Sequence, residues 1–134
     1  MSSEFSISVR VYYEDTDAGG VVYYANYLKF MERARTEWLR SLGFEQDDLI
    51  KAPGIVFAVR SVQLDFLKPA RFNNVLTIKS VVEHVGKASL VFKQWIMHND
   101  IKCCEGKIKV ACLDADTFSP SPIPDDIEQK LKTL

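Results

Sequence analysis

The chain has 134 residues, the length of one domain and too short for two, so residues 1–134 are expected to form a single domain. With 47% hydrophobic and 26% charged residues, 6 Gly and 5 Pro, the composition excludes disordered, collagen-like and low-complexity chains. Lys and Arg total 17 against 18 Asp and Glu, a formal charge of -1, so the chain lacks the basic character of a nucleic-acid-binding domain.

The first part of the chain predicts a strand followed by one long helix. Apolar side chains alternate along residues 5–13, which is typical of a strand with one buried face. A second apolar series has the spacing of one helix face, and Gly43 ends it. The members of that series are Tyr27, Phe30, Met31, Ala34, Trp38 and Leu42. The side facing solvent is expected to carry Lys29, Glu32, Arg33, Arg35, Glu37 and Arg40.

The second part predicts four strands and a short tail. After a loop around Pro53 and Gly54, a bent strand is expected over residues 55–67, followed by a turn at Asn73 and Asn74. The meander that follows has strands at 75–83, 88–97 and 101–113, joined by turns at 84–87 and 98–100. The remainder, 114–134, has helical spacing near its end and is expected to be either docked or frayed.

This order of elements predicts an α+β protein in which a five-stranded antiparallel sheet wraps around one long central helix. One helix cannot cover a sheet of that size, so edges and a partly apolar second face remain. We therefore expect the chain to associate with copies of itself.

Cysteine usage and the N-terminus indicate the compartment. The three Cys have no CxxC or Cys/His ligand spacing, which indicates reduced, buried thiols and no zinc site. The first residues lack the basic and apolar regions of a signal peptide, and no run of about 18 apolar residues occurs. These features predict a soluble, cytoplasmic protein that does not span a membrane.

Residues 12–27 carry the strongest indication of chemistry, because they place two carboxylates in a glycine-rich turn just before a helix. The first N–H groups of a helix lack internal acceptors and carry about half a positive charge, so they stabilise a developing oxyanion. An ionised Asp17 would attack an activated acyl group or act as a base on water. The alternative is that Asp15 and Asp17 are only turn and cap residues. A calcium loop starting at Asp15 is disfavoured, because Gly19 and Asn26 stand where ligands are needed.

Other catalytic arrangements are poorly supported. The chain has no GxSxG elbow, phosphate-binding loop, HExxH or dinucleotide-binding glycine pattern. His84 and His98 fall at predicted turns and are expected to be exposed. Cys103 and Cys104 have no assigned His partner, so a cysteine nucleophile is disfavoured.

Residues 10–39, RVYYEDTDAGGVVYYANYLKFMERARTEWL, strongly resemble the Tol-Pal-associated acyl-CoA thioesterases of Gram-negative bacteria. Those enzymes belong with the 4-hydroxybenzoyl-CoA thioesterase-like hot-dog proteins. The resemblance continues through residues 57–71 and 86–94. It implies a hot-dog fold, a homodimer or homotetramer, and hydrolysis without a metal or a cofactor.

The same resemblance assigns roles in the acidic segment. Asp17 is implied to be the catalytic aspartate, the backbone N–H of Tyr24 the oxyanion donor, and Asp15 a structural residue. Relatives in the Tol-Pal branch commonly have His where this chain has Tyr24. Because the implied donor is a backbone amide, this difference would spare the oxyanion hole and alter the pocket wall.

Coenzyme A brings phosphates, so cationic side chains are expected near the mouth of the pocket. The candidates are Arg60, Arg71 and Lys87. Lys87 with Ser89 is preferred, because the resemblance places the GKAS hairpin near the nucleotide.

The leading hypothesis is therefore an acyl-CoA thioesterase that releases free acid and CoA at a pocket between subunits, its substrate delivered by CoA or by an acyl carrier protein. The alternative is a non-catalytic module that binds acyl-CoA or acyl carrier protein. A hot-dog dehydratase needs a His acting with an acid, and neither His lies in residues 14–20.

Overall fold

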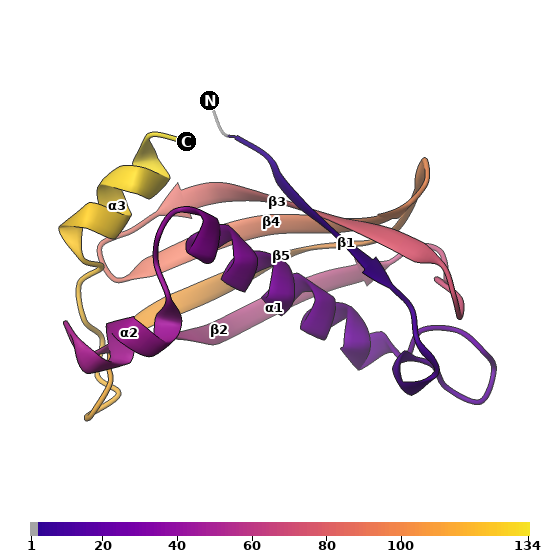
Figure 1. The fold of residues 1–134 in the computed structure, drawn as a ribbon, viewed down its shortest axis with the longest axis horizontal. Coiled ribbons are helices and arrows are strands. Elements are labelled where there is room, and N and C mark those ends of the chain that lie inside the picture. The colour runs from indigo at the N-terminus through magenta and orange to yellow at the C-terminus, as the bar shows by residue number, and fades with distance from the viewer. Residues whose placement is uncertain (1–2) are drawn as a thin grey trace.

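A computed structural model describes residues 3–134 and shows one curved antiparallel sheet with a long helix across one of its faces (Figure 1). The strands stand in the order β1-β3-β4-β5-β2, and all neighbouring pairs are antiparallel. They are β1 (Phe5–Arg10), β2 (Ile55–Phe66), β3 (Val75–Val85), β4 (Ser89–His98) and β5 (Ile101–Asp114). The helices are η1 (Tyr13–Asp15), α1 (Tyr24–Ser41), α2 (Gln46–Lys51) and α3 (Asp125–Lys132).

This arrangement confirms the predicted α+β architecture of five strands around one long helix. The predicted bend in the strand from residue 55 appears as a register shift in β2 between Val59 and Ser61, with Arg60 as the extra residue. No helix in the part of the chain that the structure describes combines the length and apolar character of a membrane span.

Several predicted boundaries were wrong. β1 ends at Arg10 rather than at residue 13, because the chain turns there into the short helix η1. β3 continues to Val85 and β4 to His98, so both histidines lie in strands and not in turns, and His98 is only partly exposed. α2 occupies part of a predicted loop. Its six residues are largely polar and none is buried, so the sequence has no apolar periodicity there from which a helix could be predicted.

The core lies between α1 and the sheet. Phe30, Met31 and Ala34 are completely buried on the predicted apolar face of the helix. Trp38 stacks on Phe5 of β1, with ring centroids 5.6 Å apart, which holds the edge strand to the helix. The C-terminal tail is docked rather than frayed, since α3 buries Ile127 and Leu131.

All three cysteines are free and buried, as predicted. Burial raises the pKa of each thiol above its ordinary value, and that of Cys104 reaches about 12. Because a thiol needs its thiolate form to react, none of the three has the properties of a nucleophile at neutral pH.

Candidate active site at the start of helix α1

The acidic segment folds into a tight loop that returns the chain to the start of α1. The N–H of Asp17 donates to the carbonyl of Val21 (2.9 Å), and Thr16 pairs with Val22 in an isolated bridge. Gly20 has φ 77°, a left-handed conformation that favours glycine at the tip of this loop. The loop is also tied to the connection after β2, because the N–H of Val22 donates to the carbonyl of Ala70 (2.8 Å).

The two aspartates of the loop have different environments. Asp15 is only 6% exposed, and its carboxylate accepts hydrogen bonds from the N–H of Tyr12 (2.9 Å) and the side-chain amide of Asn26 (3.0 Å). Asp17 is exposed, and its Oδ1 accepts one hydrogen bond, from the N–H of Gly19 (2.9 Å). Asp15 therefore braces the loop against the helix, whereas Asp17 keeps Oδ2 without a donor among residues 3–134.

The N-terminus of α1 presents free donors beside this loop. No side chain caps the helix, and the first amide to find an acceptor is that of Asn26, which donates to the carbonyl of Tyr23 (2.8 Å). In the described chain the N–H groups of Tyr24 and Ala25 have no acceptor. An open carboxylate and an electropositive helix start thus lie on one short stretch of backbone.

Aromatic side chains surround this helix start. Tyr23 packs on Tyr24, and Tyr24 meets Phe66 of β2 edge to face, with centroids 6.2 Å apart. Tyr27 also contacts Phe66, and its hydroxyl accepts the N–H of Ala70 (3.1 Å). Burial raises the pKa of Tyr27, so its phenol stays neutral. Tyr24 itself is 61% exposed at the start of the helix.

The predicted nucleotide contacts fall at different places. Arg71 is exposed and pairs through its backbone with Val21, so it lies beside the acidic loop. Arg60 is exposed at the register shift of β2. Lys87 and Ser89 border the β3–β4 turn, where the carbonyl of Lys87 accepts the N–H of Ile123 (2.8 Å).

That turn lies at the opposite end of the sheet from the acidic loop (Figure 1). The register places the end of β1 against the start of β3, and the turn follows the far end of β3. One chain therefore brings Asp17, Tyr24 and Arg71 together and leaves Lys87 and Ser89 away from them.

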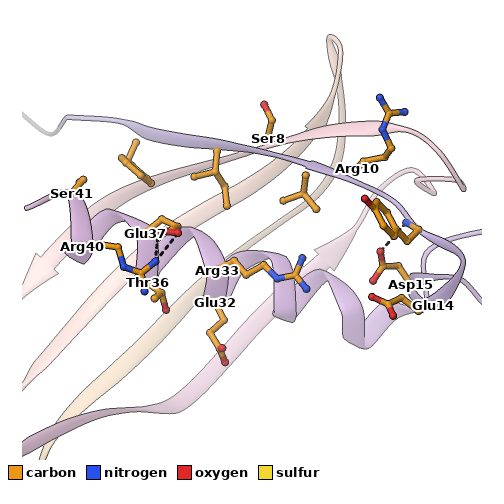
Figure 2. Close-up of a pocket in the computed structure, with 14 residues that line it drawn as sticks. Ser8, Arg10, Glu14, Asp15, Glu32, Arg33, Thr36, Glu37, Arg40 and Ser41 are labelled. Carbon is orange, nitrogen blue, oxygen red and sulfur yellow. Dashed lines mark hydrogen bonds and ion pairs between the residues drawn. The ribbon is translucent and has the colours of Figure 1, made fainter. Parts of the chain in front are cut away.

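Two hollows adjoin α1. The first, of about 950 Å³, lies between β1 and the solvent side of the helix (Figure 2). Glu14 and Asp15 lie at one end of it, whereas Asp17 does not line it. Its walls are charged, and Arg40 pairs there with Glu37 and reaches Glu45.

The second hollow, here called the α1/β2 groove, consists of two adjoining cavities of about 270 and 220 Å³ that share Glu32, Arg35 and Val59. Arg35 was predicted to face solvent, and that prediction was wrong, because the side chain is 8% exposed. It lies at the border of the buried stripe, one turn from both Met31 and Trp38.

The partners of Arg35 were not predicted from the sequence either. Gln94 and Ser80 are completely buried, although both are polar. Each stands at an inward position of its strand, in phase with Ile78 on β3 and with Phe92 and Ile96 on β4. A polar residue in the apolar phase of a strand was the pattern that could have revealed them.

An antiparallel sheet wrapped around one long central helix is the arrangement that defines hot-dog proteins. Residues 11–131 match the model of the thioesterase-like superfamily, and the chain therefore belongs to that superfamily. It is 41% identical over 128 residues to the acyl-CoA thioesterase YbgC of Haemophilus influenzae, covering 96% of this chain and 94% of that one. It is also 41% identical over 129 residues to the acyl-CoA thioester hydrolase YbgC of Escherichia coli O6:H1, with 96% of both chains covered.

A crystal structure of a probable thioesterase from Bartonella henselae has the same fold. It superimposes with a TM-score of 0.87 at 34% identity and covers 91% of this chain and 100% of the other. The hot-dog fold implied by the sequence is thereby confirmed.

Proposed function

We propose that this chain is an acyl-CoA thioesterase, a thioester hydrolase that converts acyl-CoA to free acid and CoA. The names of relatives that match almost the whole chain support this function. The observation that carries it is local: the carboxylate of Asp17 keeps one oxygen open beside the uncapped start of α1, whose first amides have no acceptor in the described chain.

In the proposed reaction the thioester carbonyl oxygen accepts a hydrogen bond from the N–H of Tyr24. Asp17 either attacks the carbonyl carbon directly or removes a proton from an attacking water. In the water route a C–O bond forms to water, the negative charge develops at the Tyr24 amide, the C–S bond breaks, and the proton that Asp17 removed passes to the leaving CoA thiolate. In the direct route the same C–S cleavage leaves a mixed anhydride on Asp17. A water then hydrolyses this anhydride, which releases the free acid, restores the Asp17 carboxylate and supplies the proton taken up by CoA thiolate. A single oxyanion donor contributes on the order of 10²- to 10³-fold in rate.

The contacts of Asp15 are a further support for the proposed role of Asp17. Asp15 holds the loop to the helix through Tyr12 and Asn26, whereas the carboxylate of Asp17 makes only a local hydrogen bond with the N–H of Gly19. A thioester is already activated, so the proposal includes no metal and no cofactor.

We further propose that the complete pocket is shared between copies of the chain in a homodimer or homotetramer. Arg60 and Arg71 are available to CoA phosphates within one chain, whereas a role for Lys87 and Ser89 requires a second copy, since they lie at the far end of the sheet. A cytoplasmic location, an acyl carrier protein as donor and a link to the Tol-Pal system are also proposals, and they rest on the resemblance of residues 10–39.

Release of free thiol from a panel of acyl-CoAs tests the activity. We expect turnover of short, medium or long alkanoyl-CoAs or of an aromatic acyl-CoA, with a low background because the protein's own thiols are buried. A parallel assay with acyl carrier protein thioesters identifies the donor. Binding of acyl-CoA by calorimetry without any thiol release would instead support the alternative, a non-catalytic binding module.

A further inference from the structure

Arg35 occupies an unusual position between α1 and the sheet. Its Nη1 donates to Oε1 of Gln94 (2.9 Å). The amide nitrogen of Gln94 in turn donates to the carbonyl of Met31 (3.0 Å) and to the hydroxyl of Ser80 (2.8 Å). Both N–H groups of Gln94 are thus used, which fixes the orientation of the amide and holds the Arg35 side chain through its oxygen.

The charge of Arg35 has no counter-ion in the described chain. Each ion pair found among residues 3–134 involves another cation, and Glu32 acts on Arg35 only by longer-range attraction. Burial lowers the pKa of Arg35 to about 10, which still leaves it charged at neutral pH. A buried charge without a counter-ion is costly, so its presence favours a further acceptor that a ligand supplies.

The free donors of Arg35 open into the α1/β2 groove. Its other N–H groups make no hydrogen bond, yet no buried side-chain nitrogen or oxygen in the described residues lacks a partner, so these groups reach open space. The surrounding walls are mostly apolar and include Leu28, Phe57, Val62, Leu90 and Ile108, while Glu32 lines both cavities with Arg35. Guanidinium groups only donate hydrogen bonds, so the missing ligand is an acceptor.

The groove ends one turn of α1 from the proposed oxyanion donor. Leu28 and Val62 line its nearer part, and one turn further along α1 Tyr24 contacts Phe66 of β2. Arg35 follows Tyr24 by about 16 Å along the helix axis, and helical side chains lean back toward the N-terminus. An extended chain advances roughly 1.2 Å per backbone atom, so about 8 to 13 atoms connect the two positions.

We infer that Arg35 is a specificity-determining residue that binds a carboxylate at the far end of the acyl group, with a hydroxyl as a weaker ligand. The inference rests on the proposed function, because it takes the Tyr24 amide as the position of the thioester carbonyl. The substrate class it names is a medium-chain acyl-CoA with an ω-carboxyl group. A carboxylate accepts two parallel hydrogen bonds from a guanidinium, which favours it over a neutral group.

The test compares decanoyl-CoA with its ω-carboxyl derivative, in wild type and in Arg35→Met. We expect wild type to have the higher kcat/KM for the ω-carboxyl substrate. The ratio of the two kcat/KM values should fall on the order of 10- to 100-fold in Arg35→Met. Arg35→Lys keeps the charge but loses the planar guanidinium with its two parallel donors. Its kcat/KM ratio should therefore lie between those of wild type and Arg35→Met.

Arg33→Met is the matched control, because Arg33 lies on the other side of α1 and lines the hollow beside β1; its ratio should equal that of wild type. Thermal unfolding checks the fold of each variant. If Arg35→Met lowers both kcat/KM values equally, Arg35 has a structural role only, and the inference is overturned.

Wild type alone also tests the inference, through the ratio of its kcat/KM for the ω-carboxyl substrate to its kcat/KM for decanoyl-CoA. A ratio of one or less means that a second copy or the fold itself satisfies Arg35, which overturns the inference and leaves the proposed function intact. If wild type hydrolyses neither these thioesters nor any other acyl-CoA, the proposed function itself fails.

Discussion

At the scale of single residues, the two aspartates of the acidic loop separate folding from chemistry. Asp15 is buried with two hydrogen bonds, whereas Asp17 is exposed with one local bond to Gly19. Removing a carboxylate that satisfies buried donors leaves those donors without a partner. Asp15→Ala should therefore lower the free energy of unfolding by about 1 to 3 kcal/mol, as urea denaturation measures. Asp17→Ala is the matched control and should leave it unchanged; equal losses in the two variants would contradict this division.

Sequence could identify the acidic loop but not the environment of each side chain in it. Two carboxylates next to two glycines predicted a turn before a helix, and the structure has that turn. Which aspartate is buried depends on Asn26 and Tyr12, whose contact with Asp15 follows from the path of the loop. The prediction that Arg35 faces solvent was wrong for a related reason. Its charge indicated exposure, whereas Gln94, on a strand distant in sequence, supplies a buried hydrogen-bond partner.

At the scale of elements, the pairing of β5 with β2 depends on a glycine. Gly106 pairs with Leu64, and a Cβ there would overlap both the Leu64 side chain and the carbonyl oxygen of Gln63. The Leu64 side chain can move, but the backbone carbonyl cannot move without separating the strands. Gly106→Ala should therefore cost about 1 to 3 kcal/mol in the free energy of unfolding, measured by urea denaturation.

Two further variants make that prediction specific. Lys107 is exposed and follows Gly106, so Lys107→Ala should change the free energy of unfolding by less than about 0.5 kcal/mol. Adding Leu64→Ala to Gly106→Ala should not restore stability, because the clash with the Gln63 carbonyl remains. Full recovery in the double variant would show that only the side-chain contact matters.

Periodicity predicted β1 and α1, because the structure buries one face of each. Alternation over residues 5–13 located β1 and the spacing of six apolar residues located α1, whereas β3 and β4 were located by the turns that bound them. The short helix α2 buries nothing, so its residues carry no such pattern. The docking of α3 could not be decided from sequence either, because it depends on a distant surface that receives Ile127 and Leu131.

At the scale of the whole molecule, edge strand β2 leaves an exposed apolar surface. Val59, Val62 and Phe66 are 50%, 40% and 52% exposed on a strand with one unpaired edge. Such an edge is a template for association with another chain. We therefore expect wild type to sediment as a dimer or tetramer, and Val62→Lys to shift it toward the monomer.

Ile101→Lys is the control for that experiment. Ile101 is 51% exposed at the β4–β5 turn, so the substitution adds the same charge at a similarly exposed apolar site away from β2. It should leave the sedimentation of the protein unchanged. A wild-type monomer with full activity would contradict the shared pocket.

The most direct test of the proposed chemistry is the turnover number of Asp17→Asn with the best acyl-CoA of the panel. This substitution removes the charge and nearly keeps the shape, so the hydrogen bond from Gly19 and the fold should persist. We predict a loss of at least about 10²-fold in kcat with unchanged thermal unfolding, since the attack or the activation of water depends on the carboxylate. Wild-type turnover by Asp17→Asn would show that the thioester is cleaved without this carboxylate.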